Sequence, residues 1–424
     1  MTSFEQTTLS NGLRVLTAPM AQAKSVACFV MLAAGSRYET REAGGIAHFA
    51  EHMFFKGTER RPTARHISGE IDAIGGEFNA FTGKEYTGYY VKCAAEHRDV
   101  ALDVLVDMLR HSKFEPDEIE REKGVIIEEL NMYVDTPRDY VDGVYDQLLF
   151  DDQPLGRDII GTKETIRAAT RDTFLAYLDR WYRAPRMVAG VAGALGDDLV
   201  PRLESLLGDV QDGSSAGPEQ ARLEQSAARV KVHTKQSDQA HLRFGVPSYP
   251  IDHPDRYALG LLSTVLGGGM SSRLFTEVRE RRGLAYYVFS HNMGYTDTGT
   301  LYAQAGVDIA RIDDAISTIV QEFTRIAAEP VGAEELQKAK NFVKGRLVLS
   351  LEDPKGLILF GLRGEVLEGR VREVEEVLAG FDAVTAGDVQ RVGQDLIRED
   401  RLNLALIGPF DGPEPFEKLL VLSS

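Results

Sequence analysis

The stretch GGIAHFAEHMFFKGTERRP, residues 44–62, is the part of the sequence from which the fold and the chemistry of this chain can be interpreted. His48 and His52 are four residues apart, and on a helix such residues lie one turn apart on the same face. Their imidazoles can therefore converge on one metal ion, and zinc is commonly held by such ligands. Glu51 flanks the same face, where a carboxylate can accept a proton from a water that the metal activates. The alternative is a structural cluster in which these three side chains hydrogen-bond to one another.

A zinc site needs a third protein ligand, and the stretch DEIEREKGVIIEELNMYVD, residues 117–135, predicts a second helix rich in carboxylates. Glu122 and Glu129 are seven residues apart, so both project from one face, whereas Glu128 points about 100° away. The apolar run at 125–127 indicates a largely buried helix, and a buried carboxylate requires a partner. A solvated, charged helix is the alternative explanation for most of these glutamates.

The two stretches together resemble the pitrilysin, insulin-degrading enzyme and mitochondrial processing peptidase family of zinc metallopeptidases, and its short, two-domain bacterial and processing-peptidase branch in particular. The order His-x-x-Glu-His is the inverted motif of these inverzincins. The family places a ligand glutamate 76 or 77 positions after the second histidine, which implies Glu129 as the third ligand, with Glu128 as the rival. The resemblance thus implies one Zn²⁺ per chain, held by His48, His52 and Glu129. It also implies that Glu122 lies behind the ligands, where it orients a histidine or tunes the site.

A third stretch, NAFTGKEYTGYYVKC at residues 79–93, alternates and is rich in Thr, Tyr and Val, as strands are. It is similar to the family's substrate-facing hairpin, and the resemblance implies that Asn79, Ala80 and Phe81 pair with the backbone of a bound peptide. Edge strands are a general means of capturing extended peptides. An ordinary sheet edge is the alternative.

A fourth stretch, SSRLFTEVRERRGLAYYVFS at residues 271–290, is similar to the family segment that carries an Arg and a Tyr seven residues apart. Arg279 and Tyr286 fit this spacing, and the resemblance implies that they hold the substrate carbonyl and stabilise the tetrahedral intermediate. Local packing of a helix-end Arg against a strand Tyr is the alternative. Three neighbours compete for the assignment: Arg281, Arg282 and Tyr287.

An internal repeat organises the chain. Pro137 and Pro354 each precede an expected helix, 217 positions apart, and RMVAGVAGAL at 186–195 recurs in character as RLNLALIGPF at 401–410. We therefore expect an α+β fold of two homologous domains, each a mixed, mainly antiparallel sheet with helices packed on it.

The expected boundaries are a zinc-binding peptidase domain at 1–210, a linker at 211–222 and a homologous domain at 223–424 that carries the Arg and Tyr pair. The linker is indicated by its Gly, Ser, Asp and Gln content. The second domain has the apolar stretch LSTVLGGGMSSRLF, residues 262–275, where the histidine helix would be, and Arg346 lies 217 positions beyond Glu129. Only the first domain is therefore expected to bind metal.

Composition agrees with a cytoplasmic globular enzyme. The chain has 424 residues, 43% of them hydrophobic, which is enough for more than one core. Its two cysteines, Cys28 and Cys93, disfavour a disulfide framework, and no apolar run approaches the roughly 20 residues of a membrane span. The formal charge of −17 disfavours nucleic acid as a partner.

The resulting hypothesis is a zinc-dependent endopeptidase or oligopeptidase that hydrolyses unfolded peptides or precursor segments inside a closed chamber. Since long family members join four such domains in one chain, this two-domain chain is expected to form a homodimer with shared active sites. The alternative is a non-catalytic partner subunit that binds peptides, as some relatives of the processing peptidase are.

Overall fold

The computed structural model describes residues 3–213 and 217–422 and consists of two compact units. Unit 1 comprises Met1–Asn131, Arg157–Glu219 and Val348–Glu373, and unit 2 comprises Met132–Gly156, Gln220–Leu347 and Val374–Ser424. These units differ from the contiguous domains expected at 1–210 and 223–424, because two segments, 132–156 and 348–373, belong to the unit formed mainly by the other half of the chain. Residues 214–216 of the expected linker lie outside the described residues.

The sheet of unit 1 has the strand order β1-β2-β6-β3-β5-β4. Its strands are β1 (Glu5–Thr8), β2 (Arg14–Pro19), β3 (Ser25–Leu32), β4 (Glu77–Thr82), β5 (Thr87–Ala94) and β6 (Met187–Gly193). β2 and β6 run parallel, and the other neighbouring pairs are antiparallel. β4 is an edge strand, so one side of its backbone is not paired with any described strand.

The sheet of unit 2 repeats this arrangement with the order β7-β11-β8-β10-β9. Its strands are β7 (Arg229–Thr234), β8 (Ala240–Ser248), β9 (Ala285–Gly294), β10 (Gly299–Val307) and β11 (Asn403–Gly408). β7 and β11 are parallel and the remaining pairs antiparallel. When the strands are ranked along the chain, this order is the same as that of β2 to β6 in unit 1. The two mixed, mainly antiparallel sheets with their helices confirm the predicted α+β class.

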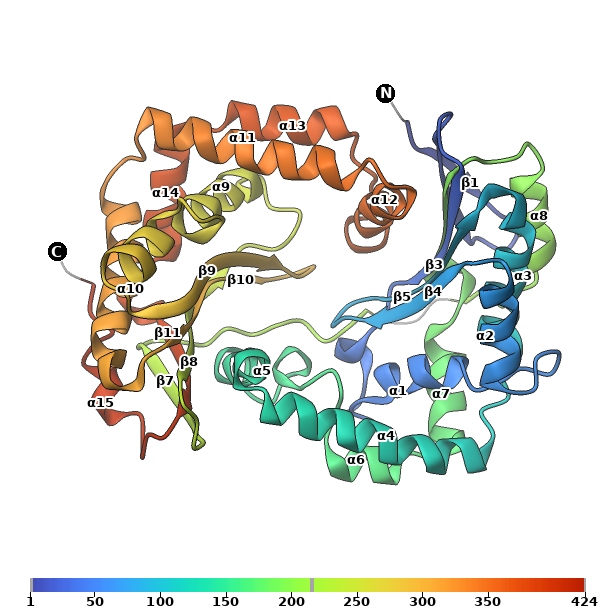
Figure 1. Ribbon diagram of the computed structural model, residues 1–424, viewed down its shortest axis with the longest axis horizontal. Helices are drawn as coiled ribbons and strands as arrows, with labels where there is room; N and C mark the ends of the chain where they lie inside the picture. The colour runs from blue at the N-terminus through green and yellow to red at the C-terminus, as the bar shows by residue number, and fades with distance from the viewer. Residues whose placement is uncertain (1–2, 214–216, 423–424) are drawn as a thin grey trace. The chain divides into compact units, whose positions relative to one another are not determined.

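Helices cover both sheets (Figure 1). Those that lie wholly in unit 1 and come from the first half of the chain are α1 (Ile46–Phe54), α2 (Ala64–Ala73), α3 (Arg98–His111), α6 (Lys163–Ala168), α7 (Arg171–Trp181) and α8 (Leu199–Leu207). Those that lie wholly in unit 2 and come from the second half are α9 (Arg256–Gly267), α10 (Ile312–Ala328), α13 (Val374–Ala383), α14 (Ala386–Leu396) and α15 (Glu414–Glu417). The short helical segments are η1 (Ser36–Tyr38), η2 (Ala95–His97), η3 (Pro154–Gly156), η4 (Ala184–Arg186), η5 (Phe275–Arg281), η6 (Ile309–Arg311) and η7 (Glu399–Arg401).

Two successive helix pairs account for the exchanged segments. They are α4 (Pro116–Asp135) with α5 (Pro137–Phe150), and α11 (Ala333–Ser350) with α12 (Pro354–Glu368). α5 packs on β11, and its Val144 and Leu149 share a buried apolar cluster with Ile407 of that strand. α12 buries Leu357 and Leu362 against β2, β3 and β6 of unit 1. Each helix thus covers a sheet built from the other half of the chain. No helix in the two described ranges is both long and apolar enough to cross a membrane.

Candidate metal centre

The helix α1 begins at a position that only glycine fits. Gly45 has φ of 91°, and a Cβ there would lie 2.5 Å from the carbonyl oxygen of Ile160. The buried carboxylate of Glu39 accepts hydrogen bonds from the backbone N–H groups of Gly45 and Ala47, both at 2.7 Å. Helix N-termini favour negative charge. Burial nevertheless raises the pKa of Glu39 to about 8, despite the two backbone hydrogen bonds that favour its charged form.

Three predicted ligands converge where α1 meets α4. Nε2 of His48 lies 3.6 Å from Oε1 of Glu129, and Nε2 of His52 lies 3.5 Å from Oε2 of the same carboxylate. Donor atoms of a tetrahedral zinc site, each about 2.0–2.2 Å from the metal, are roughly 3.4 Å apart. The observed separations therefore fit a zinc ion, and the two imidazoles and one carboxylate are donors that zinc prefers. The side chain of Glu129 is 46% exposed, so the group is open to solvent on its side.

Glu122 lies behind the ligands, as the resemblance implies. Its Oε1 is 2.9 Å from Nδ1 of His52, and its Oε2 is 2.5 Å from the ammonium of Lys56. If Nδ1–H of His52 donates to this carboxylate, Nε2 is unprotonated. Its lone pair, on the side that faces Glu129, is then available to a metal ion. Burial by itself would raise the pKa of Glu122, but the hydrogen bonds from His52 and Lys56 outweigh it and hold that pKa below its ordinary value.

Glu51 lies on α1 but outside the converging group of donor atoms. Its Oε2 accepts a hydrogen bond of 2.5 Å from the hydroxyl of Thr82, the last residue of β4. A carboxylate that is next to the ligands without being one of them has a free oxygen for proton transfer. This placement is the one that a general base requires.

The rival third ligand, Glu128, is exposed and lies outside the group, and its nearest described polar partner is Asn131 at 3.4 Å. The expectation of a largely buried helix around it is wrong. Val125 is 53% exposed, whereas Ile126 is fully buried. α4 buries only one stripe, spaced three or four residues apart, as an amphipathic helix does: Ile119, Glu122, Ile126 and Leu130.

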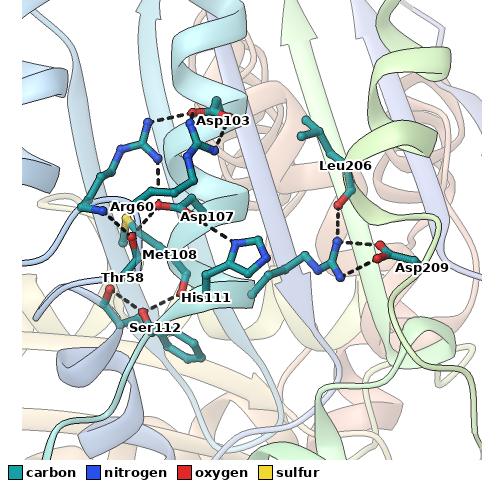
Figure 2. Close-up of polar contacts among 12 residues, drawn as sticks. Thr58, Arg60, Asp103, Asp107, Met108, His111, Ser112, Leu206 and Asp209 are labelled. Atoms are coloured by element: carbon teal, nitrogen blue, oxygen red, sulfur yellow. Dashed lines mark hydrogen bonds and ion pairs between the residues drawn. The ribbon is translucent and has the colours of Figure 1, made fainter.

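A polar network holds the segment after α1 against α3 (Figure 2). The hydroxyl of Thr58 donates to Asp107 at 2.7 Å, and the buried guanidinium of Arg61 contacts the same carboxylate at 2.8 Å. Nδ1 of His111 lies 3.1 Å from the other oxygen of Asp107, and the hydroxyl of Ser112 donates to the carbonyl of Phe54, the last residue of α1. Burial would raise the pKa of Asp107, but these hydrogen bonds outweigh it and lower that pKa. The network thereby ties the C-terminal end of α1 to α3.

The predicted substrate strand is the edge strand β4. Asn79 pairs with Tyr90 of β5, and Phe81 pairs with Gly88, so the inner side of β4 is occupied and the outer side remains for another strand. Asn79 is exposed and Phe81 is half-buried. Asn79 and Phe81 point to one face of the sheet, and Ala80 points to the other.

Arg279 and Tyr286 both lie in unit 2, on η5 and β9. η5 is a π-helix, a form that occurs frequently at functional sites. The guanidinium of Arg279 lies over the rings of Phe275 and Tyr286, and Tyr286 is 73% exposed.

Two of the residues that compete with Arg279 and Tyr286 have structural partners. The hydroxyl of Tyr287 lies 2.9 Å from Nδ1 of His241, and Arg281 pairs with Glu277 at 2.6 Å. The guanidinium of Arg138 also lies 4.6 Å from the centroid of the Tyr287 ring. Tyr286 is more exposed than Tyr287, whereas Arg281 is more exposed than Arg279, so exposure favours Tyr286 but does not separate the two arginines.

Two imidazoles, one carboxylate and a spare glutamate beside them define the site of a zinc hydrolase. The sequence pattern of the family described as "Insulinase (Peptidase family M16)" matches residues 14–163, and the pattern described as "Peptidase M16 inactive domain" matches residues 168–343. A Bacillus subtilis protein named "Uncharacterized zinc protease YmxG" is 38% identical over 95% of this chain and 97% of its own length. The chain belongs to peptidase family M16, and to its short, two-domain form.

Other relatives agree with this assignment. A Streptomyces coelicolor protein, also named a zinc protease, is 36% identical over 96% of this chain and 90% of its own length. These names support a zinc peptidase. The crystal structure of a protease from Helicobacter pylori has a TM-score of 0.88 at 22% identity and covers 96% of this chain and 100% of its own. A peptidase M16 inactive domain from Pseudomonas fluorescens has the same TM-score at 20% identity, with 96% and 98% covered, so both share the fold.

Four supporting residues were not found by sequence reasoning: Glu39, Lys56, Thr82 and Asp107. Each acts through a partner distant in the sequence or through a backbone group, so neither its residue type nor its spacing singles it out. Lys56 gives the best signal, since it lies four residues after His52 and so, on a continuing helix, on the same face.

Proposed function

We propose that this chain is a zinc-dependent endopeptidase or oligopeptidase that hydrolyses unfolded peptides or precursor segments inside a closed chamber. The observation that carries the proposal is the spacing of 3.5 and 3.6 Å between Glu129 and the two imidazoles, with Glu51 beside the group but outside it. Zinc held by His48, His52 and Glu129 would lower the pKa of a water toward neutrality.

The residues of the chain then divide the work of hydrolysis. Glu51 accepts the proton of the attacking water and delivers it to the leaving amine. Glu122 keeps His52 in the tautomer whose Nδ1 carries the proton and whose Nε2 lone pair can bind the metal. Arg279 and Tyr286 hold the substrate carbonyl, and a donor aimed at a developing oxyanion typically contributes about 3–4 kcal/mol.

Substrates bind by strand addition to the outer side of β4, next to Asn79, Ala80 and Phe81. Main-chain hydrogen bonds supply the affinity, so selectivity for side chains is loose. An edge strand accepts only an extended chain, and a stable globular protein is therefore expected to resist cleavage until it is unfolded. Equal cleavage rates for the folded and unfolded forms of one protein would contradict the chamber.

The alternative of a non-catalytic peptide-binding subunit is less well supported. The pattern named for an inactive domain matches residues 168–343, which exclude all three proposed ligands and Glu51. The match therefore describes the half of the chain in which no metal chemistry was expected.

The test of the proposed function combines zinc analysis with cleavage of a library of unstructured peptides. The purified chain is expected to contain about one zinc and to cut peptides at internal bonds, and removal of zinc by a chelator should stop cleavage. A chain that binds zinc stoichiometrically and cuts no peptide would favour the non-catalytic subunit.

We further propose that the chain acts as a symmetric homodimer with shared active sites. The proposed ligands and Glu51 all belong to unit 1, whereas Arg279 and Tyr286 belong to unit 2. In the dimer each site takes its ligands from one subunit and its Arg and Tyr from the other. Two-fold symmetry is the commonest arrangement of homo-oligomers.

Complementation tests this assembly. Inactive Glu51→Gln protein is mixed with inactive Tyr286→Phe protein under conditions that allow subunit exchange. In a mixed dimer one site carries both lesions and the other carries neither, so random pairing should restore about a quarter of wild-type activity, as two-fold symmetry requires. If exchange is demonstrated directly and no activity returns, the shared site is wrong.

A further inference from the structure

We propose that Thr82 is a positioning residue that sets the register between the general base Glu51 and a peptide bound on β4. The inference rests on the proposed function, because Glu51 needs a fixed orientation only if it transfers protons. Thr82 touches neither the metal ligands nor the peptide in this proposal. It acts through Glu51.

The contact that carries the inference joins the two elements of the site. Thr82 Oγ1 donates to Glu51 Oε2 at 2.5 Å, across 31 positions of sequence. Thr82 ends β4, the strand on which peptides are proposed to bind, whereas Glu51 lies on the metal-binding helix α1. One hydrogen bond thus connects the peptide strand to the general base.

The hydroxyl is held in place from the inner side of the sheet. Thr82 pairs with Thr87 of the neighbouring strand β5. Thr87 is fully buried, and its hydroxyl donates to the carbonyl of Ala34 at 2.9 Å. Directly after Thr82, the turn is closed by a hydrogen bond from the N–H of Gly83 to the carbonyl of Tyr86 at 2.8 Å. Because threonine is branched at Cβ, its χ1 is restricted, and the position of the hydroxyl follows that of the backbone.

The alternation of β4 directs this hydroxyl toward α1. Side chains two residues apart share a face of the sheet, so Phe78 and Thr82 point the same way. Phe78 packs against Phe55, which directly follows α1, with ring centroids 5.5 Å apart. The two contacts, Phe78 with Phe55 and Thr82 with Glu51, therefore join the same face of β4 to the metal-binding helix.

The consequence for hydrolysis follows from the two oxygens of a carboxylate. Thr82 occupies Oε2 of Glu51 and leaves Oε1 for the attacking water. The backbone of β4 positions both the Thr82 hydroxyl and the added peptide. The position of Glu51 relative to the scissile carbonyl is therefore constant. Small misplacements of reacting groups lower rates strongly, so losing this bond should slow the chemical step and leave peptide binding intact.

The experiment compares zinc-loaded full-length wild type with Thr82→Val and Thr82→Ser on one unstructured peptide. Thr82→Val keeps the shape and removes the hydroxyl, and kcat is expected to fall about 10- to 100-fold, the range that one hydrogen bond to a charged group supports. KM should stay within about twofold, because the bound peptide keeps its own contacts. Thr82→Ser restores the hydroxyl, so kcat should return to within about threefold of wild type.

Two measurements separate positioning from a structural contribution. Zinc content should remain about one per chain, and the melting temperature should change equally little in both variants. The affinity for the peptide, measured by fluorescence anisotropy in the zinc-loaded Glu51→Gln background, should not change when Thr82→Val is added. Loss of zinc, a loss of affinity as large as the loss of kcat, or an equally slow Thr82→Ser would each overturn the inference.

The two levels of the proposal fail differently. Wild type and Thr82→Val that cut the peptide equally fast would overturn the inference and leave the proposed function standing. Zinc-loaded wild type that cuts no unstructured peptide would overturn the proposed function and this inference with it.

Discussion

The two units share one architecture and differ in the side chains that their corresponding helices carry. The strand orders β2-β6-β3-β5-β4 and β7-β11-β8-β10-β9 are the same, including the place of the parallel pair. Where unit 1 has α1 with two histidines and Glu51, unit 2 has α9, whose buried face is made of apolar residues such as Leu259, Leu262 and Leu266. On α11 the position corresponding to Glu129 is the exposed residue Arg346.

This difference separates what the fold requires from what the chemistry requires. The sheet and helix arrangement of unit 2 forms with an apolar α9, so the arrangement does not depend on histidines or paired carboxylates. In unit 1 the partly buried His48 and His52 and the buried Glu122 are polar groups whose burial costs free energy unless they are paired. Their presence on a fold that does not need them supports a chemical purpose.

Removal of a proposed ligand should have the largest effect on metal binding and activity. Glu129→Ala should abolish both zinc binding and hydrolysis, because a three-ligand site loses its only carboxylate. Arg346→Ala, the same position in the other unit, and Glu128→Ala, the neighbouring residue, should leave the zinc content near one per chain. Metal analysis of the three purified variants decides the matter. If Glu128→Ala empties the site while Glu129→Ala leaves it filled, the third ligand has been misassigned.

Removal of the proposed base should lower activity nearly as much, but the metal should stay bound. Glu51→Gln keeps the shape of the side chain and its contact with Thr82 but cannot accept a proton, and general-base catalysis typically contributes about 10²- to 10⁴-fold. We expect kcat to fall by such a factor while zinc stays near one per chain. Loss of zinc together with activity would make Glu51 a ligand.

Weakening the support behind a ligand should have a smaller effect. Glu122→Gln loses the charged partner of His52 and Lys56, and partners behind metal ligands typically contribute about 10- to 100-fold in affinity. Competition with a zinc chelator measures the affinity. The residue at the same position of α11 is Ala339, which is buried in the apolar core of unit 2. An unchanged zinc affinity would remove Glu122 from the site.

The sequence predicted those parts of the fold and the site that depend on spacing along one element. The four-residue spacing of His48 and His52 and the seven-residue spacing of Glu122 and Glu129 place side chains on one helical face, and the structure has them there. The repeat predicted two similar sheets. The functions of Arg279 and Tyr286 stay predictions.

The exchange of α5 and α12 was not predictable in the same way. An apolar helix face indicates that the helix packs on something, but it does not say on which of two similar sheets. Val144 of α5 shares an apolar cluster with Ile407, more than 250 positions later, and no local pattern encodes such a pairing. The hydrogen bonds of Glu39 to backbone N–H groups are equally invisible, because backbone donors leave no mark in a sequence.

The smallest expected effect concerns how the corresponding helices of the two units begin. The N-terminus of α1 is capped by the buried carboxylate of Glu39, whose pKa is raised to about 8 mainly by burial. α9 begins at Asp255, which is paired with Arg391 at 2.6 Å, and the hydrogen bond from Arg391 lowers its pKa. A group with a raised pKa in the folded state contributes stability that is present at low pH and lost as the pH rises through that value. A group with a lowered pKa contributes stability that is lost only as the pH falls.

Stability in the window from about pH 5 to 8 should therefore report on Glu39 and not on Asp255. With zinc removed by a chelator, since metal affinity itself depends on pH, the free energy of unfolding from urea titrations should fall by up to about 1.4 kcal/mol per pH unit. Glu39→Gln cannot titrate and should show a smaller slope. Asp255→Asn should keep the wild-type slope, because Asp255 is ionised in both the folded and the unfolded chain above pH 5. An equal slope in Glu39→Gln and wild type would mean that the helix cap is ionised throughout, with the two backbone hydrogen bonds at 2.7 Å outweighing burial.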